Sequence, residues 1–183
     1  MKLHIFGASG MGVSTLGGAL GAALRLPYFD SDDYFWEASA PPFTLRCPPA
    51  RRDARLAHNL ARHPSWLVGG SSVGWGGQWL VAFDLVVFLW LPPQLRLQRL
   101  HQREHARYGA RFLADPSQAA RTQAFLEWAA GYDDSSTGGS RTLANHTSWL
   151  ARLTCPVLEL RGDLSIAARR YAIQTRLQEL ALD

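Results

Sequence analysis

The residues with the clearest chemical potential lie at the start of the chain. The apolar run Leu3 to Phe6 has the β-branched and aromatic members of a buried strand, and from Val13 apolar residues recur at helical spacing. A glycine-rich loop joins the two, as in a phosphate-binding loop, because glycines let backbone N–H groups approach a phosphate beside a helix N-terminus. We therefore expect a nucleotide to be bound by Gly7, Ala8, Ser9, Gly10, Met11, Gly12, Val13, Ser14 and Thr15.

One position departs from the phosphate-loop pattern G-x-x-x-x-G-K-[ST]. Gly7, Gly12 and Ser14 fit it, but Val13 stands where the pattern has lysine. That lysine supplies a positive charge to the β- and γ-phosphates. Lys2 is the only lysine in the chain, and about 3.3 Å per residue along the strand places it roughly 16 Å from the loop. Any replacement charge must therefore come from arginine.

Acidic residues follow the second predicted strand, Tyr28 to Asp30. A Mg²⁺ ion that bridges phosphates takes oxygen ligands, usually a loop hydroxyl and one or two carboxylates, and Ser14 and Asp30 are our candidates. A second carboxylate can accept the proton of an attacking hydroxyl. We expect Asp32 to be this base, with Asp33 beside the substrate. The alternative is that these acids only solvate a turn and cap the next helix.

Arginines recur along one later helix. Arg96, Arg99, Arg103 and Arg107 fall at steps of three, four and four, so they share a helix face, and Arg111 lies in the loop beyond. Guanidinium groups bind phosphates through paired donors and neutralise charge that develops in phosphoryl transfer. We expect Arg103, Arg107 and Arg111 to replace the missing lysine charge in catalysis. A solvated helix face is the alternative.

Aromatic residues lie in loops that would flank a second substrate. Trp36 and Trp75 could stack on a base or close over a sugar, and we expect them to contact the substrate. Core or lid packing is the alternative for these tryptophans, as for Trp79. The six histidines show no spacing typical of a metal site.

Composition limits the remaining possibilities. The 183 residues fit one domain spanning 1–183, with 47% hydrophobic residues and a net charge of +4. Cys47 and Cys155 lie far apart, which predicts reduced thiols in a cytoplasmic protein. The chain enters a predicted strand at once, so no signal peptide is expected. The apolar run Leu85 to Leu91 is too short to span a membrane.

The order of elements predicts the fold class. Strands are predicted at Leu3–Phe6, Tyr28–Asp30, Trp66–Gly69, Phe83–Leu91 and Pro156–Leu160. Helices are predicted from Val13, and at about Ala50–His63, Pro93–Arg107, Gln118–Gly131, Thr142–Leu153 and Ser165–Leu182. This alternation predicts an α/β fold with a parallel sheet covered on both faces and ligands at the carboxyl ends of the strands. Each polar cluster follows a strand, which favours an enzyme.

With these residues assembled, the chain resembles the P-loop kinases of small molecules, the adenylate, shikimate, gluconate and uridine kinase group, together with topology modulation proteins. Residues 7–16 look like their phosphate loop and its helix. Asp30-Ser31-Asp32 is similar to the shikimate kinase Asp-x-Asp, in which the first acid serves magnesium and the second meets the substrate hydroxyl. Asp32-Asp33-Tyr34-Phe35 also looks like the acidic-aromatic motif of nucleoside kinases, so the register of the base stays open.

The arginine-rich helix running into residues 108–116 resembles the lid of these kinases, within a lid-like segment of about 104–140. Gly162 and Asp163 lie where such proteins bring a loop near the adenine, and we expect them to contact the nucleotide. The resemblance implies a three-layer αβα sandwich with a five-stranded parallel sheet of order 2-3-1-4-5. It also implies ATP or GTP and Mg²⁺, with transfer of the γ-phosphoryl group to a small-molecule hydroxyl or a nucleotide acceptor.

Two other functions are open at this point. A degenerate kinase could hold a nucleotide for a structural or regulatory purpose. The missing lysine favours this hypothesis, whereas Ser14 and the Asp-x-Asp motif argue against simple decay. Nucleic-acid binding through the arginine face ranks last, because the chain lacks a recognised module for it.

Overall fold

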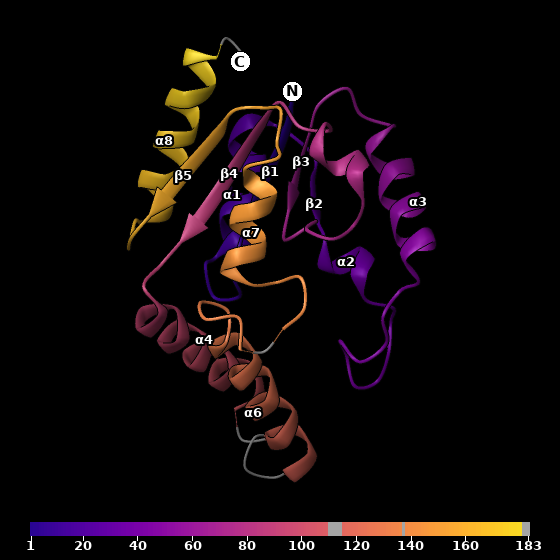
Figure 1. Cartoon of the computed structure of the whole chain (residues 1–183), viewed down its shortest axis with the longest axis vertical. Helices are drawn as coiled ribbons and strands as arrows, with labels where there is room; N and C mark the ends of the chain where they lie inside the picture. The colour runs from indigo at the N-terminus through magenta and orange to yellow at the C-terminus, as the bar shows by residue number, and fades with distance from the viewer. Residues whose placement is uncertain (110–114, 137, 181–183) are drawn as a thin grey trace.

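The computed structural model describes residues 1–109, 115–136 and 138–180. Five strands form one parallel sheet in the order β2-β3-β1-β4-β5, as predicted. The strands are β1 (Lys2–Gly7), β2 (Tyr28–Asp30), β3 (Trp66–Gly69), β4 (Leu85–Trp90) and β5 (Val157–Arg161). Helices lie on both faces of the sheet (Figure 1), so the architecture is the predicted αβα sandwich.

The alternation of side chains along β1 divides the core between the two faces. Leu3 and Ile5 face α1 (Val13–Leu24) and α8 (Ile166–Glu179), in an aliphatic cluster. The members of this cluster are buried almost completely, which stabilises the fold by roughly 1.5–3 kcal/mol for each large side chain. Helix α8 also packs directly against α1, so the C-terminal helix reaches the element that follows the glycine loop.

The opposite face of the sheet carries an aromatic core. Phe6 and Phe88 point into it from the central strands. They pack against residues of α3 (Pro49–Leu60), α7 (Leu143–Leu150) and the short helix η1 (Gly77–Leu80). The cluster also contains Trp66, Trp75, Trp79, Phe83 and Trp149.

Two helices extend beyond the carboxyl ends of the strands. Helices α4 (Pro93–Tyr108) and α6 (Pro116–Ala130) pack side by side, and in Figure 1 they lie below the sheet. Leu100, Leu126 and Ala129 form the small apolar cluster between them. None of the helices in the described part of the chain has the length and apolar character needed to cross a bilayer.

The sequence predicts these elements well, with three differences. Helix α2 (Asp32–Phe35) and η1 were not predicted, because a single turn has too few residues to show a period. Strand β4 is shorter than predicted. Phe83 packs in the aromatic core before the strand begins, and the backbone N–H of Asp84 donates to the Lys2 carbonyl oxygen.

Candidate active site

Residues 8–12 connect β1 to α1. Residues 7–15 line one wall of a cavity of about 440 Å³ at the carboxyl ends of the strands. The Met11 N–H donates to the Ala8 carbonyl oxygen at 3.2 Å and closes the turn. Gly10 and Gly12 have φ angles of 90° and 78°, which glycine adopts without strain. A Cβ on Gly10 would lie 2.9 Å from the Arg96 carbonyl oxygen, so the loop packs directly on α4.

Helix α1 begins at this loop without a side-chain cap. Its N-cap is Gly12, and its first turn contains no acidic residue. The first N–H groups of a helix have no intrahelical acceptor, and the helix dipole places partial positive charge there. Val13, Ser14 and Thr15 all line the cavity. The local structure is therefore suited to bind an anion.

The Asp30 carboxylate lies beside this helix end. It accepts a hydrogen bond from the Ser14 hydroxyl at 2.6 Å and another from the Tyr28 hydroxyl at 2.9 Å. The Asp32 backbone N–H donates to its second oxygen at 3.0 Å. Burial and the nearby Asp30 charge raise the pKa of Tyr28 above its ordinary value, so that hydroxyl stays protonated and donates. The two residues predicted to hold magnesium are thus in direct contact.

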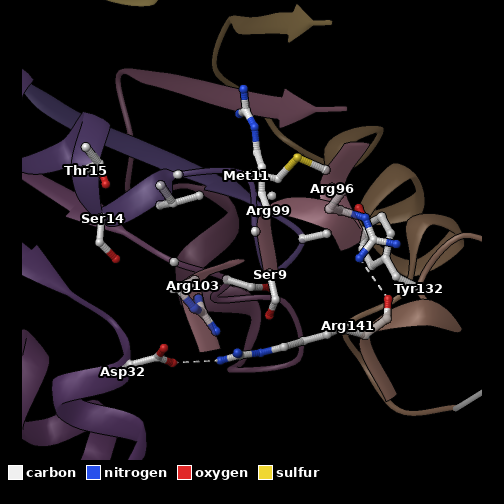
Figure 2. Close-up of a pocket in the computed structure, with 18 of the residues that line it drawn as sticks. Ser9, Met11, Ser14, Thr15, Asp32, Arg96, Arg99, Arg103, Tyr132 and Arg141 are labelled. Carbon is white, nitrogen blue, oxygen red and sulfur yellow. Dashed lines mark hydrogen bonds and ion pairs between the residues drawn. The ribbon is translucent and has the colours of Figure 1, made fainter. Parts of the chain in front are cut away.

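Asp32 also lines the cavity, where it forms an ion pair with Arg141. The shortest distance between the guanidinium and the carboxylate is 3.3 Å. Figure 2 shows Arg141 extending from the connection between α6 and α7 across the cavity to Asp32 on α2. The Arg141 guanidinium lies 5.2 Å from the centre of the Phe35 ring. Sequence reasoning missed Arg141, because it belongs to no periodic pattern and its partner is 109 residues away.

Asp33, the neighbouring acid, is placed differently. It is exposed and is not among the described residues that line the cavity. Burial of part of its carboxyl and the negative charges of Asp30 and Asp32 raise its pKa. Arg55 donates to its backbone carbonyl oxygen at 3.4 Å. Of the two acids after Asp30, only Asp32 therefore faces the phosphate loop.

The four arginines of α4 all line the cavity, but they do not form the uniform stripe that their spacing predicts. Arg96 is fully buried and donates to the Ala129 carbonyl oxygen at 2.8 Å and to Asp133 at 2.6 Å. Because its guanidinium is buried and held by these two partners, Arg96 is a fixed part of the cavity wall. The solvated-face alternative is wrong for Arg96.

The other three arginines are themselves more exposed than Arg96. Arg99 pairs with Asp163 in the loop after β5. Arg103 donates to Glu104 at 2.8 Å, and Arg107 lies 4.0 Å from the same carboxylate. Figure 2 shows Arg103 pointing into the space that also holds the Asp32–Arg141 pair. Arg111, the remaining arginine predicted to be catalytic, lies outside the described residues.

The two tryptophans predicted to contact the substrate lie in different surroundings. Trp75 is buried under the Arg52 guanidinium, which lies 3.9 Å from its ring centre, and it packs against Trp79 in the aromatic core. Packing therefore accounts for the position of Trp75 in this structure. Trp36 is partly buried, with its ring 4.8 Å from that of Phe35. Neither tryptophan is among the described residues of the cavity wall.

The remaining predicted nucleotide contacts lie in the loop after β5. Gly162 adopts a φ of 91°. Its backbone N–H donates to the Trp90 carbonyl oxygen at 2.9 Å, which ties the loop to β4. Neither Gly162 nor Asp163 is among the described lining residues of the cavity, although the ion pair between Asp163 and Arg99 connects the loop to its wall.

A buried polar network that the sequence did not indicate lies behind the cavity. The Ser71 hydroxyl is 3.1 Å from His146 Nε2, and the Tyr132 hydroxyl is 3.0 Å from His146 Nδ1. Burial, with the charge of Arg141, lowers the pKa of His146 to about 3, so its imidazole is neutral at neutral pH. Ser71 and Tyr132 reach the cavity surface. Within the described residues, no group of three or more His, Cys, Asp or Glu side chains could hold a metal ion.

No protein-family model matches the chain. Solved structures of small-molecule kinases share its fold. Shikimate kinase from Aquifex aeolicus vf5 superposes with a TM-score of 0.57 at 15% identity, over 100% of this chain and 99% of that chain. A gluconokinase from Sinorhizobium meliloti 1021 gives 0.51 at 18% identity, over 98% and 94%. Deoxyadenosine kinase from M. mycoides gives 0.53 at 11% identity, over 98% and 100%. These superpositions show that the chain shares its fold with these kinases.

A sequence relative is much nearer. It is 41% identical over 168 residues, which are 92% of this chain and 92% of the relative. Identity at this level over nearly the whole length establishes common descent. The chain belongs to the same family as the uncharacterized protein YqaC of Bacillus subtilis (strain 168).

Proposed function

We propose that this protein is an ATP- or GTP-dependent kinase that transfers the γ-phosphoryl group to a hydroxyl of a small molecule or nucleotide. One observation carries the proposal. A phosphate loop, a hydroxyl–carboxylate pair and an aspartate paired with arginine meet in a single cavity, in a fold shared with small-molecule kinases. The cavity volume of about 440 Å³ falls within the range of small-ligand pockets.

The proposed donor site is the loop itself. Backbone N–H groups of residues 7–15 and the N-terminus of α1 would bind the phosphates, because this part of the cavity offers donors and positive dipole. Arg103 and Arg107 add charge, with side chains 43% and 45% exposed. Gly162 and Asp163 remain our candidates beside the nucleotide base. The segment of about 104–140, which includes Arg111, is proposed to close over the nucleotide.

The residues present fit a magnesium ion. Ser14 and Asp30 place a hydroxyl oxygen and a carboxylate in contact at the end of the loop, and hard cations select such oxygen donors. Tyr28 and the Asp32 N–H hold the carboxylate in position. When bound there, Mg²⁺ neutralises phosphate charge and thereby supports transfer.

The acceptor would lie on the Asp32 side of the cavity. Its hydroxyl oxygen forms a bond to the γ-phosphorus while the bond from that phosphorus to the bridging oxygen breaks, and the electron pair leaves with the nucleoside diphosphate. Asp32 accepts the proton of the hydroxyl. Arg141 orients this carboxylate through their ion pair. We propose Asp33 and Trp36 as more distant contacts of the acceptor.

A second candidate function has an observation in its favour. Val13 offers no ammonium group, and Arg96, Arg99 and Arg103 each pair with an acid. A protein with these features could hold a nucleotide without transferring phosphate. This candidate and the kinase both require nucleotide binding, but only the kinase requires turnover.

Titration calorimetry with ATP, with GTP and with a non-hydrolysable analogue, with and without Mg²⁺, tests the proposal. Magnesium-dependent binding by the natural protein, followed by phosphoryl transfer in a screen of hydroxyl acceptors, would support the kinase. Binding without transfer to any acceptor would support the second candidate, particularly if Val13→Lys creates turnover. Absence of nucleotide binding by both the natural protein and Val13→Lys would overturn the proposed function.

A further inference from the structure

A buried arginine contacts the phosphate loop from the side of α8. Arg169 is 1% exposed, and its Nη1 donates to the Met11 carbonyl oxygen at 2.7 Å. The same nitrogen lies 3.8 Å from the position that a Cβ on Gly12 would occupy. Helix α8 brings Arg169 to the loop because it packs on α1 across the aliphatic core. The contact joins residues that are 158 positions apart.

The contact fixes the orientation of one peptide group in the loop. In a trans peptide the carbonyl of one residue and the N–H of the next point in opposite directions. Because Arg169 holds the Met11 carbonyl on the α8 side, the Gly12 N–H is directed to the opposite side. Gly12 is the N-cap of α1 and lines the cavity, so this N–H belongs to the group of donors offered to an anion.

The charge of Arg169 is not balanced by an acid in contact. Within the described residues, its Nε and Nη2 are buried and have no hydrogen-bond partner. Asp163, the acid that acts on it electrostatically, is paired with Arg99. Burying a cation without an anionic partner is costly. An anion bound on the other side of the loop would offset this cost. Burial and the nearby Arg99 lower the pKa of Arg169, which expresses the same cost.

We infer that Arg169 is a positioning residue for the nucleotide phosphates, which holds the Met11–Gly12 peptide in its anion-binding orientation and supplies from behind the loop the positive charge that Val13 lacks. This inference rests on the proposed binding of a nucleotide at the loop. The inference places the cation that replaces the missing lysine on α8. The spacing of the arginines had led us to expect that cation on α4, on the other side of the cavity.

Three substitutions of Arg169 test the inference by calorimetry with ATP and with adenosine, which carries no phosphate. Arg169→Gln keeps an amide donor but removes the charge, and Arg169→Met removes both. Arg169→Lys keeps the charge. The neutral variants should raise the Kd for ATP about tenfold or more, because they remove the positive charge that is buried behind the loop. Arg169→Lys should stay within about threefold of the natural protein.

Two controls separate this role from general support of the fold. Arg176→Met removes a partly exposed arginine from the same helix, and it should change neither Kd. Adenosine binding should be unaffected by every substitution, because only the phosphate contacts depend on Arg169. Val13→Lys should raise the affinity for ATP more when it is combined with Arg169→Gln than when it is made alone in the natural protein. This is expected because either cation can supply the missing charge.

The outcomes are distinct. ATP binding by the natural protein with an unchanged Kd in a folded Arg169→Gln or Arg169→Met variant overturns the inference and leaves the proposed function intact. Equal weakening of ATP and adenosine also overturns it, because that pattern indicates a purely structural role. If neither neutral variant folds, loss of affinity in Arg169→Lys overturns the role of the charge. Absence of nucleotide binding by the natural protein overturns the inference and the proposed function together.

Discussion

Acidification should destabilise this protein through two buried histidines. His4 is 0% exposed, with its ring stacked 4.5 Å from Phe83 and its Nδ1 3.2 Å from the Val68 carbonyl oxygen. Burial lowers the pKa of His4 to about 3, although the backbone hydrogen bond opposes this effect. Burial, Arg141 and His4 itself lower the pKa of His146 to about 3. Both rings are therefore neutral in the folded state well below pH 6.

In the unfolded chain, both histidines bind protons near their ordinary pKa of about 6.5. Between that pH and about 3, the unfolded state binds more protons than the folded state, so the free energy of unfolding falls as the pH falls. Each histidine should lower it by about 2 kcal/mol between pH 7.5 and 5.0, and the pair by about 4 kcal/mol. That loss is a large part of the roughly 5–15 kcal/mol typical of a domain.

Urea unfolding measured at pH values from 5.0 to 7.5 tests this prediction. The raised pKa of Asp33 acts with the opposite sign, so it would reduce the loss of stability on acidification and could not produce it. His4→Phe fits the stack with Phe6 and Phe83 and cannot bind a proton, so it should remove about half of the pH dependence. His101→Gln, at an exposed position, should retain all of it. A flat profile, or a full slope in His4→Phe, would refute the reasoning.

The remaining predictions concern the cavity and its loop. Gly10→Ala should lower the free energy of unfolding by roughly 1–3 kcal/mol, because alanine is strained at a φ of 90° and its Cβ would meet α4 at 2.9 Å. Gly18→Ala, at a position on α1 where a Cβ meets open space, should raise the free energy of unfolding by about 0.4–1 kcal/mol. If urea unfolding shows Gly18→Ala to be less stable than Gly10→Ala, the assignment of strain to Gly10 is wrong. If Asp32 is the base, Asp32→Asn should leave nucleotide affinity nearly intact while turnover falls roughly 10²–10⁴-fold, whereas loss of affinity alone would reassign it to the metal. Arg103→Ala or Arg107→Ala should weaken ATP binding or turnover strongly, and unchanged values for both would exclude these arginines as the replacement charge.

Most of the fold could be predicted because its signals are local. The short strands β2 and β3 form where the apolar runs Tyr28–Asp30 and Trp66–Gly69 end at acidic or glycine residues. The sheet order came from the family resemblance, because no local pattern specifies which strands are neighbours. Helix α2 escaped prediction because a single turn has no period to detect.

The candidate site could be predicted where its residues share one loop, one strand end or one helix face. The contact between Ser14 and Asp30 follows from topology, since both lie after parallel strands at the same edge. Arg141 and His146 could not be found, because their partners are distant in the sequence. The packing of Trp75 in the aromatic core could not be predicted, because an aromatic residue in a glycine-rich stretch has the same local pattern whether it lines a cavity or fills a core.

The arginines around the cavity differ in how easily each can reach a phosphate. Arg96 is buried in its pair with Asp133, and withdrawing it would leave a buried charge without a partner, at a cost of several kcal/mol. Arg103 is 43% exposed, but its partner Glu104 is only 7% exposed, so this carboxylate still needs a cation when Arg103 turns to a phosphate. Arg107, 4.0 Å from the same carboxylate, is placed to remain beside it. Arg169 needs no exchange, since it already holds the loop and has no acid in contact among the described residues. A protein without the loop lysine can thus divide that charge between a fixed arginine behind the loop and a mobile one in front.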